Sequence, residues 1–239
     1  MSANGINICY QTDGQPSDTP LLLIMGLGMQ LTAWPQEFVD LLVARGFYVI
    51  RFDNRDCGLS SKMGHFGKPN LPFAFVKSLL HLPLRSPYTL SDMATDSVAV
   101  LDELGIAQAH VVGASMGGMI AQTAVAQFPH RFLSLTSIMS SSGRAGLPGP
   151  TLAARKAILS RPKKPYQKEQ VLDQFVRTFQ IIGSPAYPTP EAQLRQRIGI
   201  SMERSFYPEG TARQMVAIAA SGSRTHLLRK LQLPSLVIH

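Results

Sequence analysis

The chain has 239 residues, of which 45% are hydrophobic and 16% are charged, and its formal net charge at pH 7 is +8. These fractions are ordinary for a globular protein with a buried core. The basic residues are scattered, and their densest run, at residues 161–168, is short and interrupted by proline. We therefore expect a solvated basic surface and no nucleic-acid partner.

The cysteines and the N-terminal stretch exclude further classes. Cys9 and Cys57 lack the spacing of a disulfide framework or a metal site. The opening residues MSANGINICYQTDG contain no basic segment followed by an apolar one, so no signal peptide is predicted. Because no apolar run approaches the ~18 residues of a membrane span, we expect a cytoplasmic protein with no membrane span, and we expect no cofactor and no metal.

Short apolar runs alternate with helical patterns through the first part of the chain. In chain order, the sequence predicts a strand at 21–25, a helix at 36–45, a strand at 47–52, a helix at 91–104, a strand at 109–113, a helix at 116–128 and a strand at 135–139. Thr89 and Asp92 form a capping-box pattern at the second helix. The strands are almost continuously apolar, which is typical of a parallel sheet covered on both faces, and the alternation predicts an α/β fold.

The middle of the chain breaks this alternation. Helices are predicted at 151–160, 168–182, 191–205 and 211–220, and Thr189 is expected as an N-cap before Pro190 at the first helical position. We interpret residues 143–222 as a helical cap inserted into a core formed by residues 1–142 and 223–239, with a last strand at 235–239. The long apolar loop at 65–88 is typical of a lid or binding loop.

The stretch VVGASMGG, residues 111–118, carries the strongest chemical signal. It fits the G-x-S-x-G pattern, which places a serine nucleophile on a sharp turn from a strand to a helix. Glycines at 113 and 117 avoid clashes at such a turn, and the helix N-terminus directs N–H groups at a developing oxyanion. We therefore predict that Ser115 is a catalytic nucleophile. The alternative is an ordinary strand-to-helix turn with a solvated serine.

A second glycine-containing loop, MGLGM at residues 25–29, follows the strand at 21–25. In enzymes with the serine turn described above, one oxyanion donor comes from such a loop and the other from the residue after the nucleophile. The backbone N–H groups of Leu27 and Met116 are therefore the predicted oxyanion hole. The alternative is an ordinary glycine turn.

The stretch DNRDCGLSS, residues 53–61, completes a set of motifs that resembles the α/β-hydrolase superfamily. Within it, the chain is similar to the aclacinomycin methylesterases and related capped serine esterases. The resemblance covers residues 21–139 and the final strand and is weak in the cap. Members often carry D-x-R-G-x-G-x-S here, whereas this chain has Asp56 where glycine is commoner. The resemblance implies a structural turn, in which Asp53 and Arg55 are expected to form a local ion pair.

The superfamily order is serine, then an acid, then histidine. The strand at 235–239 corresponds to the late strand that the acid usually follows, and His239 matches a strand-end histidine and not the catalytic one. The remaining histidines lie away from the expected position: His65, His81, His110, His130 and His226. We therefore expect that the triad acid and histidine are not in this chain. The C-terminal strand and helix are also expected to be absent, so the chain is expected to be truncated, cleaved, or completed by a second chain or swapped segment that supplies them.

Two functions follow from these observations. The first is a serine hydrolase that cleaves carboxylic esters through a Ser115 acyl-enzyme, with the methyl ester of a bulky apolar compound as a candidate substrate. The second is a non-catalytic or truncated protein of the same fold, which binds a small apolar ligand or needs a partner segment. Removal of the base from a serine triad costs about six orders of magnitude in rate, so the 239 residues alone are expected to be nearly inactive.

Overall fold

The structure is a computed structural model that describes residues 1–80, 82–160 and 165–239. It divides into two compact units: the core unit, Met1–Ala145 with Tyr207–His239, and the helical unit, Gly146–Phe206. The helical unit is shorter than the inserted cap expected at 143–222, because the last helix of that segment packs within the core unit. The basic run at 161–168 lies partly outside the described residues.

Within the described residues, six strands of the core unit form one sheet in the order β3-β5-β4-β6-β7-β8. The strands are β3 (Tyr10–Asp13), β4 (Thr19–Ile24), β5 (Phe47–Phe52), β6 (Ala109–Ala114), β7 (Phe132–Ile138) and β8 (Ser235–Ile238). All neighbours are parallel except β3, which pairs antiparallel with β5. A short hairpin, β1 (Ser2–Ala3) with β2 (Ile6–Asn7), precedes them. The predicted parallel sheet is confirmed.

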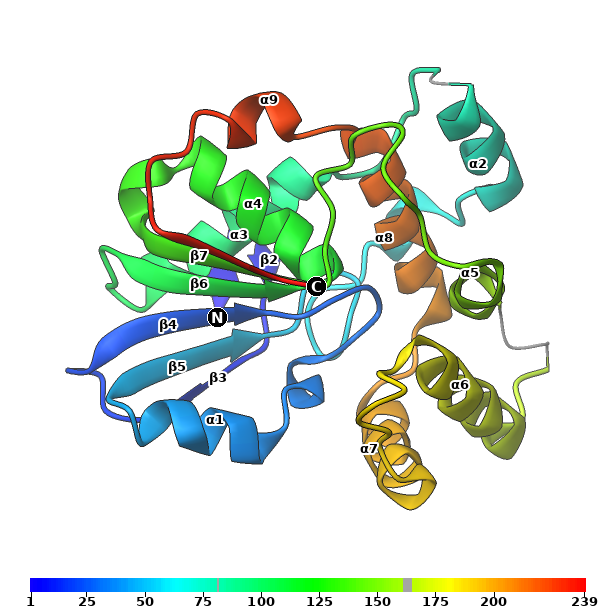
Figure 1. Ribbon diagram of the computed structural model, residues 1–239, viewed down its shortest axis with the longest axis horizontal. Coiled ribbons are helices and arrows are strands. Elements are labelled where there is room, and N and C mark those ends of the chain that lie inside the picture. Colours follow the sequence, from blue (N-terminus) through cyan, green and yellow to red (C-terminus); the bar gives the residue numbers. More distant parts are fainter. Residues whose placement is uncertain (81, 161–164) are drawn as a thin grey trace. The chain divides into compact units, whose positions relative to one another are not determined.

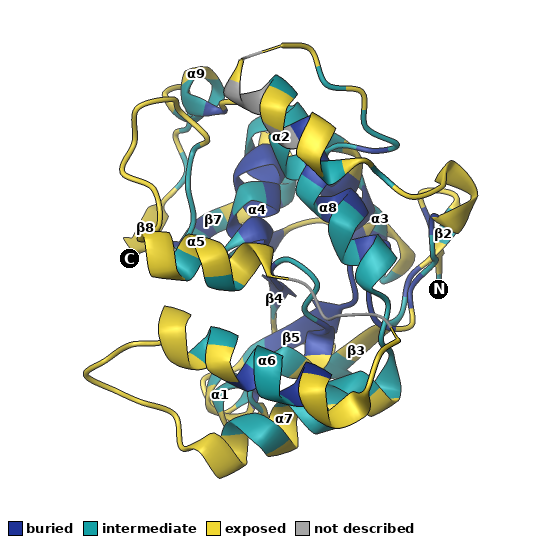
Figure 2. Cartoon of the chain, turned by 90° about the vertical axis from the view of Figure 1, so that its right-hand side faces the viewer, coloured by how far each residue is buried: buried dark blue, intermediate teal, exposed yellow. Residues whose placement is uncertain are grey.

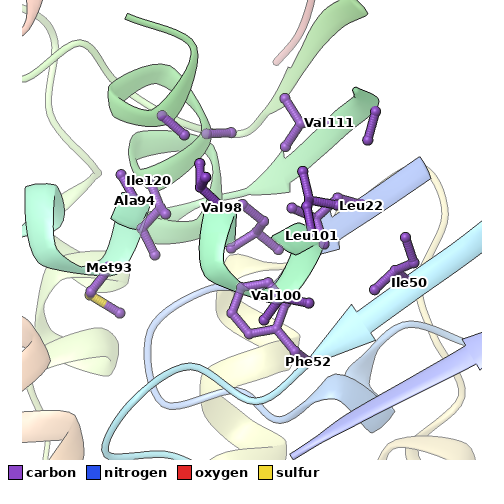
Figure 3. Close-up of a cluster of buried hydrophobic side chains, with 14 of the residues drawn as sticks. Leu22, Ile50, Phe52, Met93, Ala94, Val98, Val100, Leu101, Val111 and Ile120 are labelled. Carbon is purple, nitrogen blue, oxygen red and sulfur yellow. The ribbon is translucent and has the colours of Figure 1, made fainter. Parts of the chain in front are cut away.

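Helices cover both faces of this sheet (Figure 1). On one face lie α3 (Leu90–Glu103) and α4 (Met116–Gln127), and on the other lies α1 (Gln36–Val43). Figure 3 shows apolar side chains from the strands and from α3 and α4 gathered in one buried cluster, which includes Leu22, Phe52 and Leu101. A second cluster around Trp34 and Val39 lies with α1. The central strands β4, β5 and β6 are mostly apolar and buried because helices cover both faces of the sheet there.

The helix signals at α3 are confirmed: Thr89 and Asp92 form the predicted capping box. The apolar loop expected at 65–88 is partly helical, since it contains the turn Gly64–Phe66 and α2 (Leu71–Leu79). Another helix, α8 (Pro208–Ser221), starts earlier than predicted because proline occupies its first turn. Short helical segments complete the core unit: Leu31–Ala33, Pro129–Arg131 and α9 (Thr225–Leu228).

The helical unit contains α5 (Leu152–Leu159), α6 (Lys168–Ile182) and α7 (Glu191–Arg204). Their bounds agree with the predicted ranges to within one residue at each end. The Thr189-Pro190 motif had placed Pro190 as the first helical residue, whereas α7 begins at Glu191. Pro190 is its N-cap, so Thr189 does not cap the helix as expected. Among the described residues, no helix is long and apolar enough to cross a membrane.

Candidate active site

Ser115 lies at the turn from β6 to α4, where the sequence predicted a nucleophile. Its backbone has φ 55° and ψ −119°, a region that non-glycine residues seldom adopt and that costs about 1–3 kcal/mol. The surrounding structure holds this conformation, because the Ser115 N–H donates to the Ile138 carbonyl of β7 at 2.9 Å. The serine therefore occupies a strained turn at the N-terminal end of a helix whose dipole favours negative charge.

Glycines make the close packing around this turn feasible. A Cβ at Gly113 would lie 2.2 Å from the Gly117 carbonyl oxygen, and a Cβ at Gly117 would lie 2.0 Å from the Ile24 carbonyl oxygen. A Cβ at Gly118 would lie 2.7 Å from the Ser140 Cβ. The neighbours at 113 and 117 are backbone atoms, which cannot rotate away. Only glycine at these positions lets the start of α4 lie directly on β4 and β6.

The structure brings the predicted oxyanion loop beside the serine. A Cβ at Gly26 would lie 3.2 Å from the Ser115 Cβ and 3.7 Å from its Oγ. Leu27 follows in the loop and Met116 follows the serine. Among the described residues, neither the Leu27 N–H nor the Met116 N–H donates to a protein acceptor. The two predicted donors are thus on adjacent segments at the carboxyl edge of the sheet.

Two buried amide side chains, which the sequence did not signal, hold this loop. Asn54 donates to the Met25 carbonyl at 2.9 Å. From α8, Gln214 accepts from the Gly28 N–H at 2.8 Å and donates to the Arg55 carbonyl at 2.8 Å. Since Gln214 is 186 residues from Gly28 in sequence, no local pattern could have paired them.

The turn at 53–61 has the structural role that was predicted, but with different partners. Asp53 accepts from the backbone N–H groups of Leu31 and Leu59, at 2.8 Å each. The predicted Asp53–Arg55 ion pair is wrong, because the Arg55 guanidinium pairs with Asp96 of α3 through two contacts of 2.6 Å. A carboxylate on α3 matches the guanidinium fork with both oxygens, which an adjacent turn residue does not.

Asp56, the departure from the family motif, forms a buried ion pair with Arg213 of α8. Both guanidinium contacts are 2.8 Å, and the Tyr88 hydroxyl donates to the same carboxylate at 2.8 Å. Burial, followed by the nearby Asp56 charge, raises the pKa of Tyr88. The hydrogen bond to Asp56 is the main cause that raises the pKa of Arg213. Tyr88 and Arg213 therefore stay protonated, and the cluster ties the turn to α8.

Among the described residues, no histidine or carboxylate forms a hydrogen bond with the Ser115 hydroxyl. His110 bonds Ser134 through Nδ1 at 2.7 Å, and His65 lies against the Phe66 ring. His81 lies outside the described residues. The described histidines and carboxylates also form no cluster that could hold a metal.

The whole pattern can be compared with known proteins. A family described as "alpha/beta hydrolase fold" matches residues 19–233. The chain belongs to the α/β-hydrolase family. Two solved structures share this fold over nearly the whole chain. A meta-cleavage product hydrolase from Pseudomonas fluorescens has a TM-score of 0.72 at 18% identity, covering 100% of this chain and 77% of that one. An enol-lactonase from Burkholderia xenovorans has a TM-score of 0.65 at 22% identity, covering 99% and 79%.

The curated relatives of this α/β hydrolase include two methylesterases, so the resemblance found in the sequence is confirmed. A rhodomycin D methylesterase from Streptomyces peucetius is 36% identical over 77% of this chain and 54% of its own length. Another, from Streptomyces sp. strain C5, is 31% identical over 77% of this chain and 61% of its own length. The matched region therefore spans less than two thirds of either relative.

Proposed function

We propose that this α/β hydrolase carries the nucleophile and oxyanion hole of a serine hydrolase that cleaves carboxylic esters. The observation that carries the proposal is Ser115, held at φ 55° on the turn into α4 with Gly26 against its side chain. A serine with only a structural role would not need this strained backbone conformation. A nucleophile gains exposure at the sheet edge and an adjacent helix N-terminus.

The proposed reaction has two halves. The Ser115 Oγ attacks the ester carbonyl and gives its proton to a general base, while the Leu27 and Met116 N–H groups stabilise the oxyanion. Collapse of this intermediate breaks the bond to the alcohol, which takes the proton and leaves an acyl-serine. Water, deprotonated by the same base, then releases the carboxylic acid and restores Ser115. Loss of one oxyanion donor typically costs about 3–4 kcal/mol in the transition state.

We further propose that the base and its acid belong to polypeptide that adjoins β8. Among the described residues, none contacts the Ser115 hydroxyl as a base would. The carboxyl end of β8 lies at the same end of the sheet as Ser115, because β6, β7 and β8 all run parallel. The residues of β8 are exposed (Figure 2) and β8 is the last strand of the described sheet, so a neighbouring strand has room to pair there.

For the substrate, we propose the methyl ester of a bulky apolar compound. Support comes from the two curated relatives, which are named for methylesterase activity on rhodomycin D. Their identity to this chain, 31% and 36%, is enough to suggest the reaction class. The test of this proposal compares the turnover of methyl esters with that of longer alkyl esters of the same acid. The methyl esters should be cleaved faster.

Covalent labelling tests the nucleophile. The natural protein that contains this chain should react with a fluorophosphonate, and intact-mass analysis should show one adduct per chain. Ser115→Ala should lose the adduct and the ester turnover. Ser134→Ala removes the hydroxyl that bonds His110 on the same sheet and should keep both. Labelling that persists in Ser115→Ala, or its absence from the natural protein, would contradict the proposal and favour a non-catalytic ligand-binding role.

A further inference from the structure

The chain bends sharply just after β7, beside the serine turn. Met139 has φ 41°, a left-handed value that is unfavourable for a residue with a Cβ. Hydrogen bonds hold the bend on both sides: Ile138 accepts from the Ser115 N–H at 2.9 Å, and the Met139 N–H donates to Ile238 of β8 at 2.8 Å. The Met139 side chain is 62% exposed, so burial of this side chain does not account for the strained backbone.

The bend brings Ser140 onto the serine turn. The Ser140 hydroxyl donates to the Ser115 carbonyl oxygen at 2.8 Å. That oxygen already accepts the Met119 N–H at 3.2 Å, so the turn of α4 is closed without Ser140. The absence of a side chain at Gly118 leaves the space that Ser140 occupies, since a Cβ there would lie 2.8 Å from the Ser140 Oγ. Three features of the chain, at 118, 139 and 140, thus converge on one carbonyl.

The carbonyl that accepts from Ser140 belongs to the same peptide group as the Met116 N–H. A peptide group is planar, so a hydrogen bond that fixes the direction of its oxygen also fixes the direction of its N–H. A donor on the oxygen further polarises the group and strengthens the N–H as a donor. We propose that Ser140 is a positioning residue, which orients and polarises the Met116 N–H for the oxyanion. This inference rests on the proposed serine-hydrolase function.

The segment after Ser140 is clamped by Arg224, which keeps the hydroxyl in place. The Arg224 guanidinium donates to the Ser141 carbonyl at 2.7 Å, and its backbone N–H donates to the Ser142 carbonyl at 2.8 Å. No carboxylate among the described residues pairs with this buried arginine, and burial lowers its pKa. The buried Arg224 guanidinium thus donates to backbone carbonyls and pairs with no described carboxylate, and these bonds fix the position of the loop that carries Ser140.

The test compares three side chains of similar size at position 140 in the natural protein. Ser140→Ala removes the donor, and Ser140→Cys replaces it with a weaker one. Because one hydrogen bond is lost, kcat for an ester should fall roughly 3- to 10-fold in the alanine variant, with KM within about twofold of the parent. The cysteine variant should lie between them. Affinity for a boronic acid that mimics the tetrahedral state should fall in parallel with kcat.

The control is Ser134→Ala, which removes the hydrogen bond between Ser134 of β7 and His110 of β6 and should leave kcat unchanged. Unchanged kcat and boronate affinity in Ser140→Ala would overturn the inference. So would a loss that appears only in KM or in the midpoint of thermal unfolding. These outcomes differ from failure of the proposed function, in which the natural protein shows no Ser115-dependent turnover at all.

Discussion

Asp56 is an acidic residue in a backbone conformation that favours glycine. Its φ is 65°, and its buried carboxylate accepts from the Met63 N–H, the Tyr88 hydroxyl and both arms of the Arg213 guanidinium. The left-handed conformation costs of order 1–2 kcal/mol for a residue with a Cβ. The carboxylate offsets that cost only while Arg213 is present. Asp56 and Arg213 therefore each compensate the buried charge of the other.

This mutual dependence predicts a large coupling energy. Arg213→Leu should destabilise the protein by about 3–5 kcal/mol, because it leaves the Asp56 charge buried without its cation. Asp56→Gly combined with Arg213→Leu should cost clearly less than the sum of the single substitutions, since the double variant buries no charge and relieves the strained φ. Urea unfolding of the four proteins in the cycle measures this. Additive free energies would show that the pair is not coupled.

The residues around the serine turn differ in how far away in the sequence their interaction partners lie. Ser115, Gly113 and Gly117 could be predicted because a turn from strand to helix depends on neighbours within a few positions. Asp56 and Arg213 are 157 residues apart, and their pairing depends on how α8 packs, which the local sequence does not encode. The Asp53–Arg55 prediction failed for the same reason: proximity in sequence suggested a pair, whereas α3 offered Arg55 a better carboxylate.

Among the elements, α4 depends on close contact with the sheet at Gly117, where a Cβ would lie 2.0 Å from the Ile24 carbonyl oxygen. Gly117→Ala should destabilise the core unit by about 3 kcal/mol, because the new Cβ meets backbone and the helix must move. Fluorophosphonate labelling of Ser115 should slow in parallel. Gly199→Ala in α7 is the matched control. Nothing lies within 4 Å of a Cβ at that position, so it should stabilise its helix by about 0.5–1 kcal/mol. Equal effects in urea unfolding of the two variants would refute this account.

The predictability of each element follows from its length and its partners. Long amphipathic or buried segments were predicted, such as α6, whose observed bounds are Lys168–Ile182. The short strands β1 and β2 were missed, since two-residue strands carry no periodicity. Helix α2 was predicted as a loop. Its stretch LPFAFVKSL has proline as its second residue, and its polar residues do not recur with the period of a helix. The compact helical unit ends at Phe206, so α8 lies in the core unit although it is helical.

At the scale of the whole molecule, the two edges of the sheet differ. On one side β3 is polar, with the sequence YQTD. On the other side β8 is apolar, and Leu236, Val237 and Ile238 are 55%, 74% and 47% exposed. Within the described residues, β8 pairs with β7 alone. An exposed apolar edge strand with unpaired backbone groups is a template for pairing with another strand. The net charge of +8 opposes non-specific association, so pairing should be directed by this edge.

The 239 residues produced alone should therefore associate through β8. Size-exclusion chromatography with light scattering should show a mass above that of the monomer that rises with concentration. Val237→Lys should shift this equilibrium toward monomer, because an edge lysine must keep its ammonium in water and blocks close approach of a second strand. Leu41→Lys places the same charge on α1, at a side chain that is 57% exposed, and should not shift it. If both lysine variants dissociate the chain equally, then charge alone governs association and the β8 edge is not the contact.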